Sequence, residues 1–292
     1  MATRIQKVSV VGCGLMGAGI AEVCARQGFD TLVLEATPEL AEKGMARIQG
    51  SLEKAVTRGK LDAAKKDEVL GRLRTTTERS DLADRGLVIE AIVESLGAKS
   101  ELFGALSKIC PKETIFATNT SSLSVTELAA ATDRPARFVG LHFFNPVPVM
   151  PLVEVVRGVS TSEGTFELMK GFGESLGKVV IAAQDAPGFV VNRLLIPFLL
   201  DAVRALEQGV ASRDDIDQGM KLGCGHPMGP LTLLDFVGLD TTYSIAQIMF
   251  EEFKDPRYAA PPLLKRLVLA GHTGRKSGRG FYDYESDGGV KK

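Results

Sequence analysis

The sequence predicts an α/β protein with a mostly parallel sheet domain over residues 1–186 and a smaller all-helical domain over residues 187–292. Three observations support this prediction. Short β-branched segments alternate with longer amphipathic segments in the first domain, which is typical of βαβ units. A glycine-rich turn follows the first of these segments directly. Beyond residue 185 the β-branched segments stop and helical patterns replace them.

Seven segments of the first domain have the length and composition of strands. They are residues 8–11, 31–34, 87–93, 114–117, 138–143, 152–156 and 179–182. Helical patterns separate the early segments, so we expect these strands to pair in parallel with helices covering the sheet. The later segments follow one another too closely for a helix each time. A hairpin-like region is therefore predicted between residues 138 and 156.

In the second domain, residues 189–207 are apolar nearly all round and precede Gly209, which is typical of a helix C-terminus. Ser212, followed three residues later by Asp215, predicts the N-cap of another helix. A helix that is apolar on all sides must be buried. A domain of roughly 105 residues covers such a helix with difficulty, so we expect a homodimer that forms through the helical domain. Coverage by neighbouring helices and the first domain is the alternative.

Composition and charge argue against several classes of protein. The chain has 35 Lys and Arg against 36 Asp and Glu, so a general nucleic-acid partner is not expected. The longest apolar stretch, residues 189–200, contains Asn192, Arg193 and Pro197 and is shorter than the ~20 helical residues that span a bilayer. The four cysteines have no metal-site or disulfide spacing, and we expect no signal peptide before the first strand. We therefore expect a cytoplasmic protein with reduced thiols, no metal and no membrane partner.

Residues 12–17 form a Gly-Cys-Gly-Leu-Met-Gly turn between the first strand and a helical segment. Gly12, Gly14 and Gly17 suit a tight turn that brings a pyrophosphate to a helix N-terminus, where free N–H groups and the helix dipole favour an anion. Glu35 ends the next strand 18 residues after Gly17, which matches the ribose-binding acid of this fingerprint. A carboxylate there repels a 2′-phosphate, so the sequence predicts a Rossmann-like site for NAD. The alternative is a turn that serves packing alone.

A basic stripe is predicted on the helix that follows Glu35. Lys43, Arg47, Ser51, Lys54 and Arg58 fall within about 80° of one another at about 100° per residue. Lys and Arg side chains supply charge-assisted donors, so this face would suit a ligand with several phosphates. A solvated helix face is the alternative.

A histidine and a glutamate mark a candidate catalytic pair. His142 ends a predicted strand, where an α/β sheet presents its ligand crevice. Glu154 lies inside an apolar β-branched segment, where a buried acid needs a partner. A strand-turn-strand passage would place it beside His142, the arrangement in which an acid orients a general acid–base histidine. A purely structural role for both is the alternative.

The sequence resembles the L-3-hydroxyacyl-CoA dehydrogenase family, in particular its single-function 3-hydroxybutyryl-CoA dehydrogenase type. The matching segments occur in the family's order over residues 8–284, and the middle ones are highly specific. They are residues 12–20 (GCGLMGAGI), 119–123 (NTSSL), 140–150 (GLHFFNPVPVM), 185–193 (DAPGFVVNR), 226–230 (HPMGP) and 280–282 (GFY). The resemblance implies reversible NAD-dependent oxidation of (S)-3-hydroxyacyl-CoA to 3-oxoacyl-CoA, with short-chain substrates expected, in fatty-acid or butyrate metabolism.

The resemblance also implies roles for individual residues. His142 is the general base for the 3-hydroxyl, Glu154 stabilises the resulting imidazolium, and Ser121 and Asn192 hydrogen-bond the reacting oxygen. Asn192 belongs to the helical domain, so we expect the two domains to complete the site together.

Cofactor and coenzyme A contacts are implied in the same way. The cofactor contacts are Gly12, Gly14, Leu15, Met16, Gly17, Glu35, Glu94, Lys99, Ser121, Asn145 and Lys276. Ser51 and Arg58, two members of the basic stripe, match the family's coenzyme A contacts, and Ser121 and Asn192 complete the substrate contacts. Relatives often have Lys at position 58, so the geometry of that contact is open.

Two alternative functions remain open at this point. One is an NAD-dependent dehydrogenase of a free sugar acid of the gulonate type, which keeps the same four polar groups. The basic stripe and the Asn-Thr-Ser-Ser segment at residues 119–122 favour a coenzyme A thioester instead. The other is a catalytically silent NAD-binding protein, against which the intact His, Glu, Ser and Asn argue.

Overall fold

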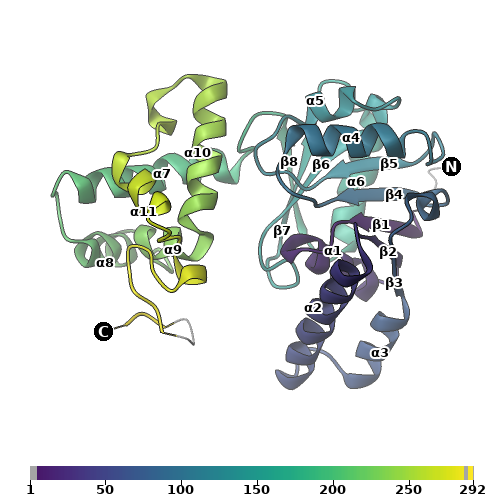
Figure 1. The fold of residues 1–292 in the computed structure, drawn as a ribbon, viewed down its shortest axis with the longest axis horizontal. Helices are drawn as coiled ribbons and strands as arrows, with labels where there is room; N and C mark the ends of the chain where they lie inside the picture. Colours follow the sequence, from purple (N-terminus) through teal and green to yellow (C-terminus); the bar gives the residue numbers. More distant parts are fainter. Residues whose placement is uncertain (1–4, 286–288, 292) are drawn as a thin grey trace. The chain divides into compact units, whose positions relative to one another are not determined.

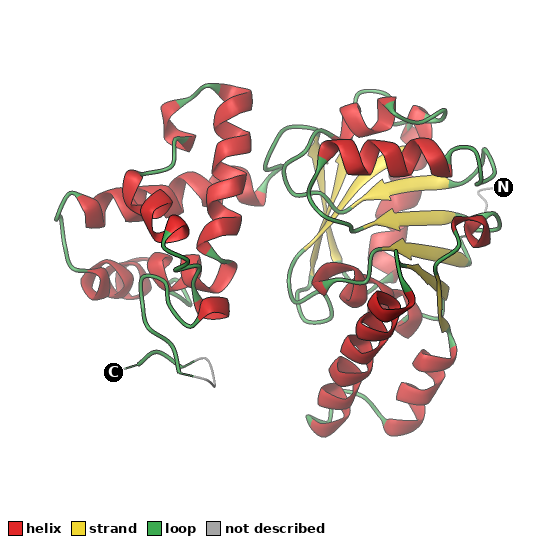
Figure 2. Ribbon diagram, in the orientation of Figure 1, coloured by secondary structure: helices red, strands yellow, loops and turns green. Residues whose placement is uncertain are grey.

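The structure of this protein is a computed structural model that describes residues 5–285 and 289–291. The chain divides into two compact units, Met1–Ala186 and Pro187–Lys292. The first unit contains an eight-stranded sheet covered by helices, and the second is built from helices (Figures 1 and 2). The predicted fold class, a Rossmann-like α/β domain followed by a helical domain, is confirmed.

The sheet has the strand order β3-β2-β1-β4-β5-β6-β7-β8, and every neighbouring pair is parallel except β6 and β7. The strands are β1 (Lys7–Val11), β2 (Asp30–Leu34), β3 (Leu73–Thr76), β4 (Leu87–Glu90), β5 (Ile115–Thr118), β6 (Phe138–Phe143), β7 (Leu152–Arg157) and β8 (Val179–Gln184). All seven predicted strands are present, and the predicted hairpin is the antiparallel pair β6 and β7. β3 was not predicted, because this edge strand reads Leu-Arg-Thr-Thr and buries only Leu73 fully.

Six helices cover the sheet or extend from it. They are α1 (Leu15–Arg26), α2 (Pro38–Thr57), α3 (Ala63–Gly71), α4 (Leu96–Leu106), α5 (Val125–Ala130) and α6 (Glu163–Ser175). Figure 1 shows α2 and α3 projecting together beyond the β3 edge. The inner strands are buried on both faces, as expected of a parallel sheet between helical layers. The carboxyl ends of the parallel strands therefore open on one edge of the sheet, which is where such folds bind ligands.

The second unit contains five helices in the part of the chain that the structure describes. They are α7 (Val191–Glu207), α8 (Arg213–Cys224), α9 (Pro230–Val237), α10 (Leu239–Phe253) and α11 (Pro262–Leu269). Gly209 follows α7 with a φ of 69°, and the Ser212 hydroxyl accepts a hydrogen bond from the Asp215 amide, so both predicted helix boundaries are confirmed. No helix among residues 5–285 is long and apolar enough to cross a bilayer.

The long helix α7 is buried along one face only. Ile196, Leu199, Leu200 and Val203 belong to the core of the second unit. Leu194 on the same helix is 72% exposed. Within the second unit, the neighbouring helices therefore bury one face of α7 and leave the side chain of Leu194 exposed.

Two buried aspartates fasten the C-terminal segment to the second unit. Asp235 accepts hydrogen bonds from the backbone amides of Phe281 and Tyr282, each at 2.9 Å. Asp217 accepts a hydrogen bond from the Tyr282 hydroxyl at 3.1 Å. Burial raises the pKa of Asp235, and burial and the Asp217 charge raise that of the Tyr282 phenol. These bonds hold the Gly-Phe-Tyr segment in place.

Candidate active site

The glycine turn joins β1 to α1 at the carboxyl edge of the sheet. Gly12 has a φ of 90°, a left-handed conformation that favours glycine. A Cβ on Gly17 would lie 1.8 Å from the Gly12 carbonyl oxygen, so the turn itself excludes a side chain there. A Cβ on Gly14 would meet nothing within 4 Å. The first and third glycines are required by local packing, whereas the second leaves open space at the N-terminus of α1.

The peptide of Cys13 inside this turn is held from both sides. The Glu35 carboxylate accepts a hydrogen bond from the Cys13 amide, and the Arg47 guanidinium donates one to the Cys13 carbonyl at 2.9 Å. The Cys13 thiol packs against Gly44 of α2, where a Cβ would lie 2.4 Å from Sγ. Burial, with a contribution from the Glu35 charge, raises the pKa of Cys13 to about 11, so the thiol is protonated at neutral pH. Cys13 is a packing residue.

The predicted basic stripe lies along α2, and its members differ in what they contact. Lys43, Lys54 and Arg58 are exposed, and Arg58 is the C-cap residue of the helix. The Arg47 guanidinium turns toward the glycine turn. Ser51 is half-buried. Arg47 is exposed as well, so the exposed part of the stripe contains four cations, of which Arg47 is bonded to the Cys13 carbonyl.

His142 and Glu154 lie side by side in the β6–β7 pair. The antiparallel register places the two residues directly opposite each other, and His142 Nδ1 lies 2.7 Å from Glu154 Oε2. Glu154 has no exposed surface, and His142 is 6% exposed. A buried carboxylate at Nδ1 fixes the orientation of the ring. The sequence-based expectation that a turn would bring these residues together agrees with this contact.

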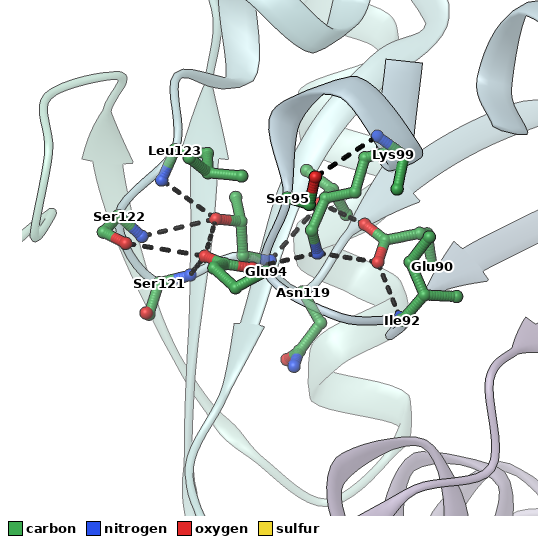
Figure 3. Close-up of polar contacts among 12 residues, drawn as sticks. Glu90, Ile92, Glu94, Ser95, Lys99, Asn119, Ser121, Ser122 and Leu123 are labelled. Carbon is green, nitrogen blue, oxygen red and sulfur yellow. Dashed lines mark hydrogen bonds and ion pairs between the residues drawn. The ribbon is translucent and has the colours of Figure 1, made fainter. Parts of the chain in front are cut away.

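The loop that carries Ser121 follows β5 and is organised by a carboxylate from another loop. Glu94 accepts hydrogen bonds from the Thr120 hydroxyl, the Ser121 amide and the Ser122 hydroxyl, the last two at 3.2 and 3.5 Å. In Figure 3 the Ser121 hydroxyl points away from this network. Asn119 at the start of the loop accepts a hydrogen bond from the Phe143 amide at 2.9 Å. The Ser121 loop is therefore tied to the strand that carries His142.

Lys99 lies behind the same loop, buried between two acids. Its ammonium group is 2.7 Å from Glu90 Oε1 and 3.0 Å from Glu94 Oε2. Sequence reasoning missed Glu90, although the signal was the one that pointed to Glu154. Both are acids within an apolar β-branched segment, where burial demands a partner.

The remaining predicted site residues lie elsewhere. Leu15, Met16 and Asn145 are at or near the carboxyl edge of the sheet, and Asn145 follows β6 on the surface. Asn192 is in the first turn of α7, and Lys276 forms an ion pair with Asp240 at 2.6 Å, both within the second unit. The roles of these residues in cofactor and substrate binding stay predictions.

A hollow of about 750 Å³ in the first unit lies away from this site. It is lined by residues such as Lys7, Gln27 and Asp30, at the amino ends of β1 and β2. Because α/β sheets bind ligands at the carboxyl ends of their strands, we assign the functional site to the opposite edge. Within residues 5–285 and 289–291, no group of His, Cys, Asp and Glu is placed to hold a metal ion.

Comparisons with known proteins agree on one family. The models of the 3-hydroxyacyl-CoA dehydrogenase NAD-binding domain and C-terminal domain match residues 7–186 and 188–284. The 3-hydroxybutyryl-CoA dehydrogenase of Mycobacterium tuberculosis is 51% identical over 97% of this chain and 100% of its own length. The human mitochondrial hydroxyacyl-coenzyme A dehydrogenase is 45% identical, covering 96% of this chain and 92% of its own. The (S)-3-hydroxybutyryl-CoA dehydrogenase structure from Ralstonia eutropha superimposes with a TM-score of 0.93 at 43% identity, covering 97% of this chain and 100% of its own.

Proposed function

The chain belongs to the 3-hydroxyacyl-CoA dehydrogenase family, and from that premise we propose that it catalyses the reversible NAD-dependent oxidation of (S)-3-hydroxyacyl-CoA to 3-oxoacyl-CoA. We propose 3-hydroxybutyryl-CoA and acetoacetyl-CoA as its substrate pair, as the names of its relatives suggest. The observation that carries the proposal is the buried contact between His142 and Glu154 at the edge of the sheet where the glycine turn lies. The predicted cofactor, NAD, agrees with the NAD-binding domain of the family.

The residues at the glycine turn fit NAD. Gly14 leaves open space where the N-terminus of α1 presents free amides, which suits a pyrophosphate. Glu35 stands at the end of β2, and its second oxygen accepts only the Ala36 amide at 3.1 Å among the bonds described, so the carboxylate retains lone pairs for ribose hydroxyls. By family resemblance, Glu94, Lys99, Asn145 and Lys276 complete the cofactor contacts.

The proposed chemistry assigns one task to each polar residue. His142 takes the proton of the 3-hydroxyl on its Nε2 side, because Nδ1 faces Glu154. Glu154 stabilises the positive charge that the ring gains with this proton. Ser121 and Asn192 donate or accept hydrogen bonds at the reacting oxygen and hold it in line. NAD, when bound, supplies the acceptor for the hydride that leaves C3.

The exposed cations of α2 support a coenzyme A thioester as substrate. Lys43, Lys54 and Arg58 provide three positive charges on one side of a helix. Phosphate groups are the ligands that such charges recognise most strongly. Ser51 and Arg58 are the two positions that match the family's coenzyme A contacts. A free sugar acid lacks the phosphates that would use this surface.

We also propose that the protein is a homodimer through its helical unit and that it functions in the cytoplasm. The exposed apolar side chain of Leu194 on α7 supports a subunit contact. The four cysteines are free thiols, and three of them are buried, which suits a reducing compartment. Sedimentation of the purified protein tests the first proposal, and fractionation of the cells that produce it tests the second.

A comparison of thioester and free-acid substrates tests the proposed function. We expect acetoacetyl-CoA to support rapid oxidation of NADH, and acetoacetate without coenzyme A to be far poorer. The variant His142→Gln should lower turnover by about 10² to 10⁴ while NADH still binds. Preference for a free sugar acid would instead support the gulonate type of dehydrogenase. No turnover with any 3-hydroxyacyl or 3-oxoacyl thioester would point to a silent NAD-binding protein.

A further inference from the structure

Glu90, the last residue of β4, is a fully buried carboxylate to which the proposed chemistry gives no task. Its Oε1 accepts hydrogen bonds from the Lys99 ammonium group and the Ile92 amide, both at 2.7 Å. Its Oε2 accepts one from the Thr118 hydroxyl, also at 2.7 Å. The carboxylate is therefore held from strand β5, from helix α4 and from its own loop. Such a well-satisfied buried charge is costly to disturb.

The ammonium group of Lys99 connects Glu90 to a second carboxylate. The ammonium group lies between Glu90 and Glu94, and the Lys99 side chain is 1% exposed, against 35% for Glu94 (Figure 3). One cation is thus shared by two acids. A buried cation that loses one of its partners is drawn more strongly to the other, because no water replaces the missing charge.

Glu94 connects this ion pair to the loop that carries the substrate-facing serine. Its Oε2 contacts Lys99, whereas its Oε1 accepts the hydrogen bonds from Thr120, Ser121 and Ser122. Figure 3 shows the two halves of the network meeting at this carboxylate. A rotation of Glu94 toward Lys99 would therefore lengthen the bonds that fix the backbone of the loop.

We propose that Glu90 is a positioning residue that acts through Lys99 and Glu94 to hold Ser121 at the reacting oxygen; this inference rests on the proposed function. With a carboxylate at position 90, the Lys99 ammonium group is attracted to both acids, and Glu94 keeps its hydrogen bonds to the Ser121 loop. With a neutral side chain at position 90, Lys99 draws Glu94 away from the Ser121 amide. The Ser121 hydroxyl then loses its alignment, although no substrate contact has been removed.

A double-mutant cycle between Glu90 and Ser121 tests this inference. The variants are Glu90→Gln, Ser121→Ala and the double variant, and kcat for acetoacetyl-CoA reduction is measured at saturating NADH. We expect Glu90→Gln to lower kcat by about 10- to 100-fold, the scale of a misplacement of about 1 Å. In the Ser121→Ala background the same change should lower kcat by no more than about twofold, because the group being positioned is already absent.

A matched control separates positioning from loss of stability. Arg85 is a cation that is 4% exposed and, like Lys99, forms ion pairs with two acids, Asp30 and Asp84. The variant Asp30→Asn, at the amino end of β2, therefore also leaves a buried cation with only one of its two acids. Its kcat should stay within about twofold of the unmodified protein, whatever its loss of stability in urea unfolding. If Glu90→Gln does not fold, Glu90→Asp enters the same cycle. It keeps the charge but shortens the reach to Lys99 by one methylene.

The outcomes are distinguishable. Equal losses of kcat with and without the Ser121 hydroxyl, or an unchanged kcat in Glu90→Gln, would overturn the positioning role while the dehydrogenase activity stood. An unmodified protein that does not reduce acetoacetyl-CoA would overturn the proposed function and this inference with it. A coupled loss that is confined to the Glu90 and Ser121 variants supports the inference.

Discussion

Replacing Glu154 by glutamine isolates the charge of the proposed catalytic pair. The side chain has no exposed surface and contacts His142 Nδ1 at 2.7 Å, and glutamine preserves its size and one accepting oxygen. The change therefore leaves the ring oriented but removes the negative charge that stabilises the imidazolium. With charge centres about 4 Å apart and an effective dielectric constant of about 20, the lost attraction is at most about 4 kcal/mol.

This energy corresponds to a fall in kcat of about 10² to 10³, since each 1.4 kcal/mol is about tenfold. The assay is NADH oxidation with acetoacetyl-CoA. The kcat/KM for the reverse oxidation of 3-hydroxybutyryl-CoA should fall by the same factor as the kcat/KM for the reduction, because the variant leaves the overall equilibrium unchanged. Fluorescence titration should give an NADH Kd within about twofold of the unmodified protein, which shows that the first unit is intact. A kcat within a few-fold of the original value would refute the view that Glu154 stabilises charge on His142.

Three further predictions address the turn, the stripe and the second unit. Gly17→Ala places a Cβ 1.8 Å from the Gly12 oxygen, so we expect a loss of about 1–3 kcal/mol in urea unfolding and weaker NADH binding in titration. Arg58→Glu should raise the KM for acetoacetyl-CoA about tenfold in steady-state assays without changing the NADH Kd, whereas the exposed Lys108→Glu should change neither. Burial raises the pKa of Tyr282 above its ordinary value of 10.0, so its contribution to stability is complete below about pH 10 and is lost as the pH rises further. Urea unfolding between pH 8 and 11 should show this decline, and Tyr282→Phe should reduce it; a decline of equal slope in that variant would contradict the assignment.

Local sequence patterns were sufficient for most of the sheet but not for the edge strand β3 or for the end of β4. β-branched composition located every strand that is buried on both faces. It failed for Leu73–Thr76, because an edge strand needs little apolar surface to pair. It also extended one strand too far: residues 87–93 are mostly apolar, yet β4 ends at Glu90 and Val93 is largely exposed. The amino-acid composition of a segment does not determine the residue at which its hydrogen bonds to the neighbouring strands end.

The candidate site likewise contains one contact that the sequence predicted and one that it did not. The pair His142 and Glu154 was predictable because the two residues lie on consecutive strands whose connection is short. The partners of Glu90 come from α4 and β5, and no periodicity in the sequence connects it to Lys99 or Thr118. Such contacts depend on how separate elements pack, which a single sequence expresses only through the need of a buried acid for partners.

The placement of His142 and Glu154 on paired strands determines which sequence changes preserve their contact during evolution. A one-residue slip between β6 and β7 would turn Glu154 to the opposite face of the sheet, so the pair depends on backbone register and not on the conformation of any loop. The connection between these strands, residues 144–151, can then change in length or sequence without separating the two side chains. Descendants of such a hairpin could acquire new specificities in the connection while retaining the same acid–base unit.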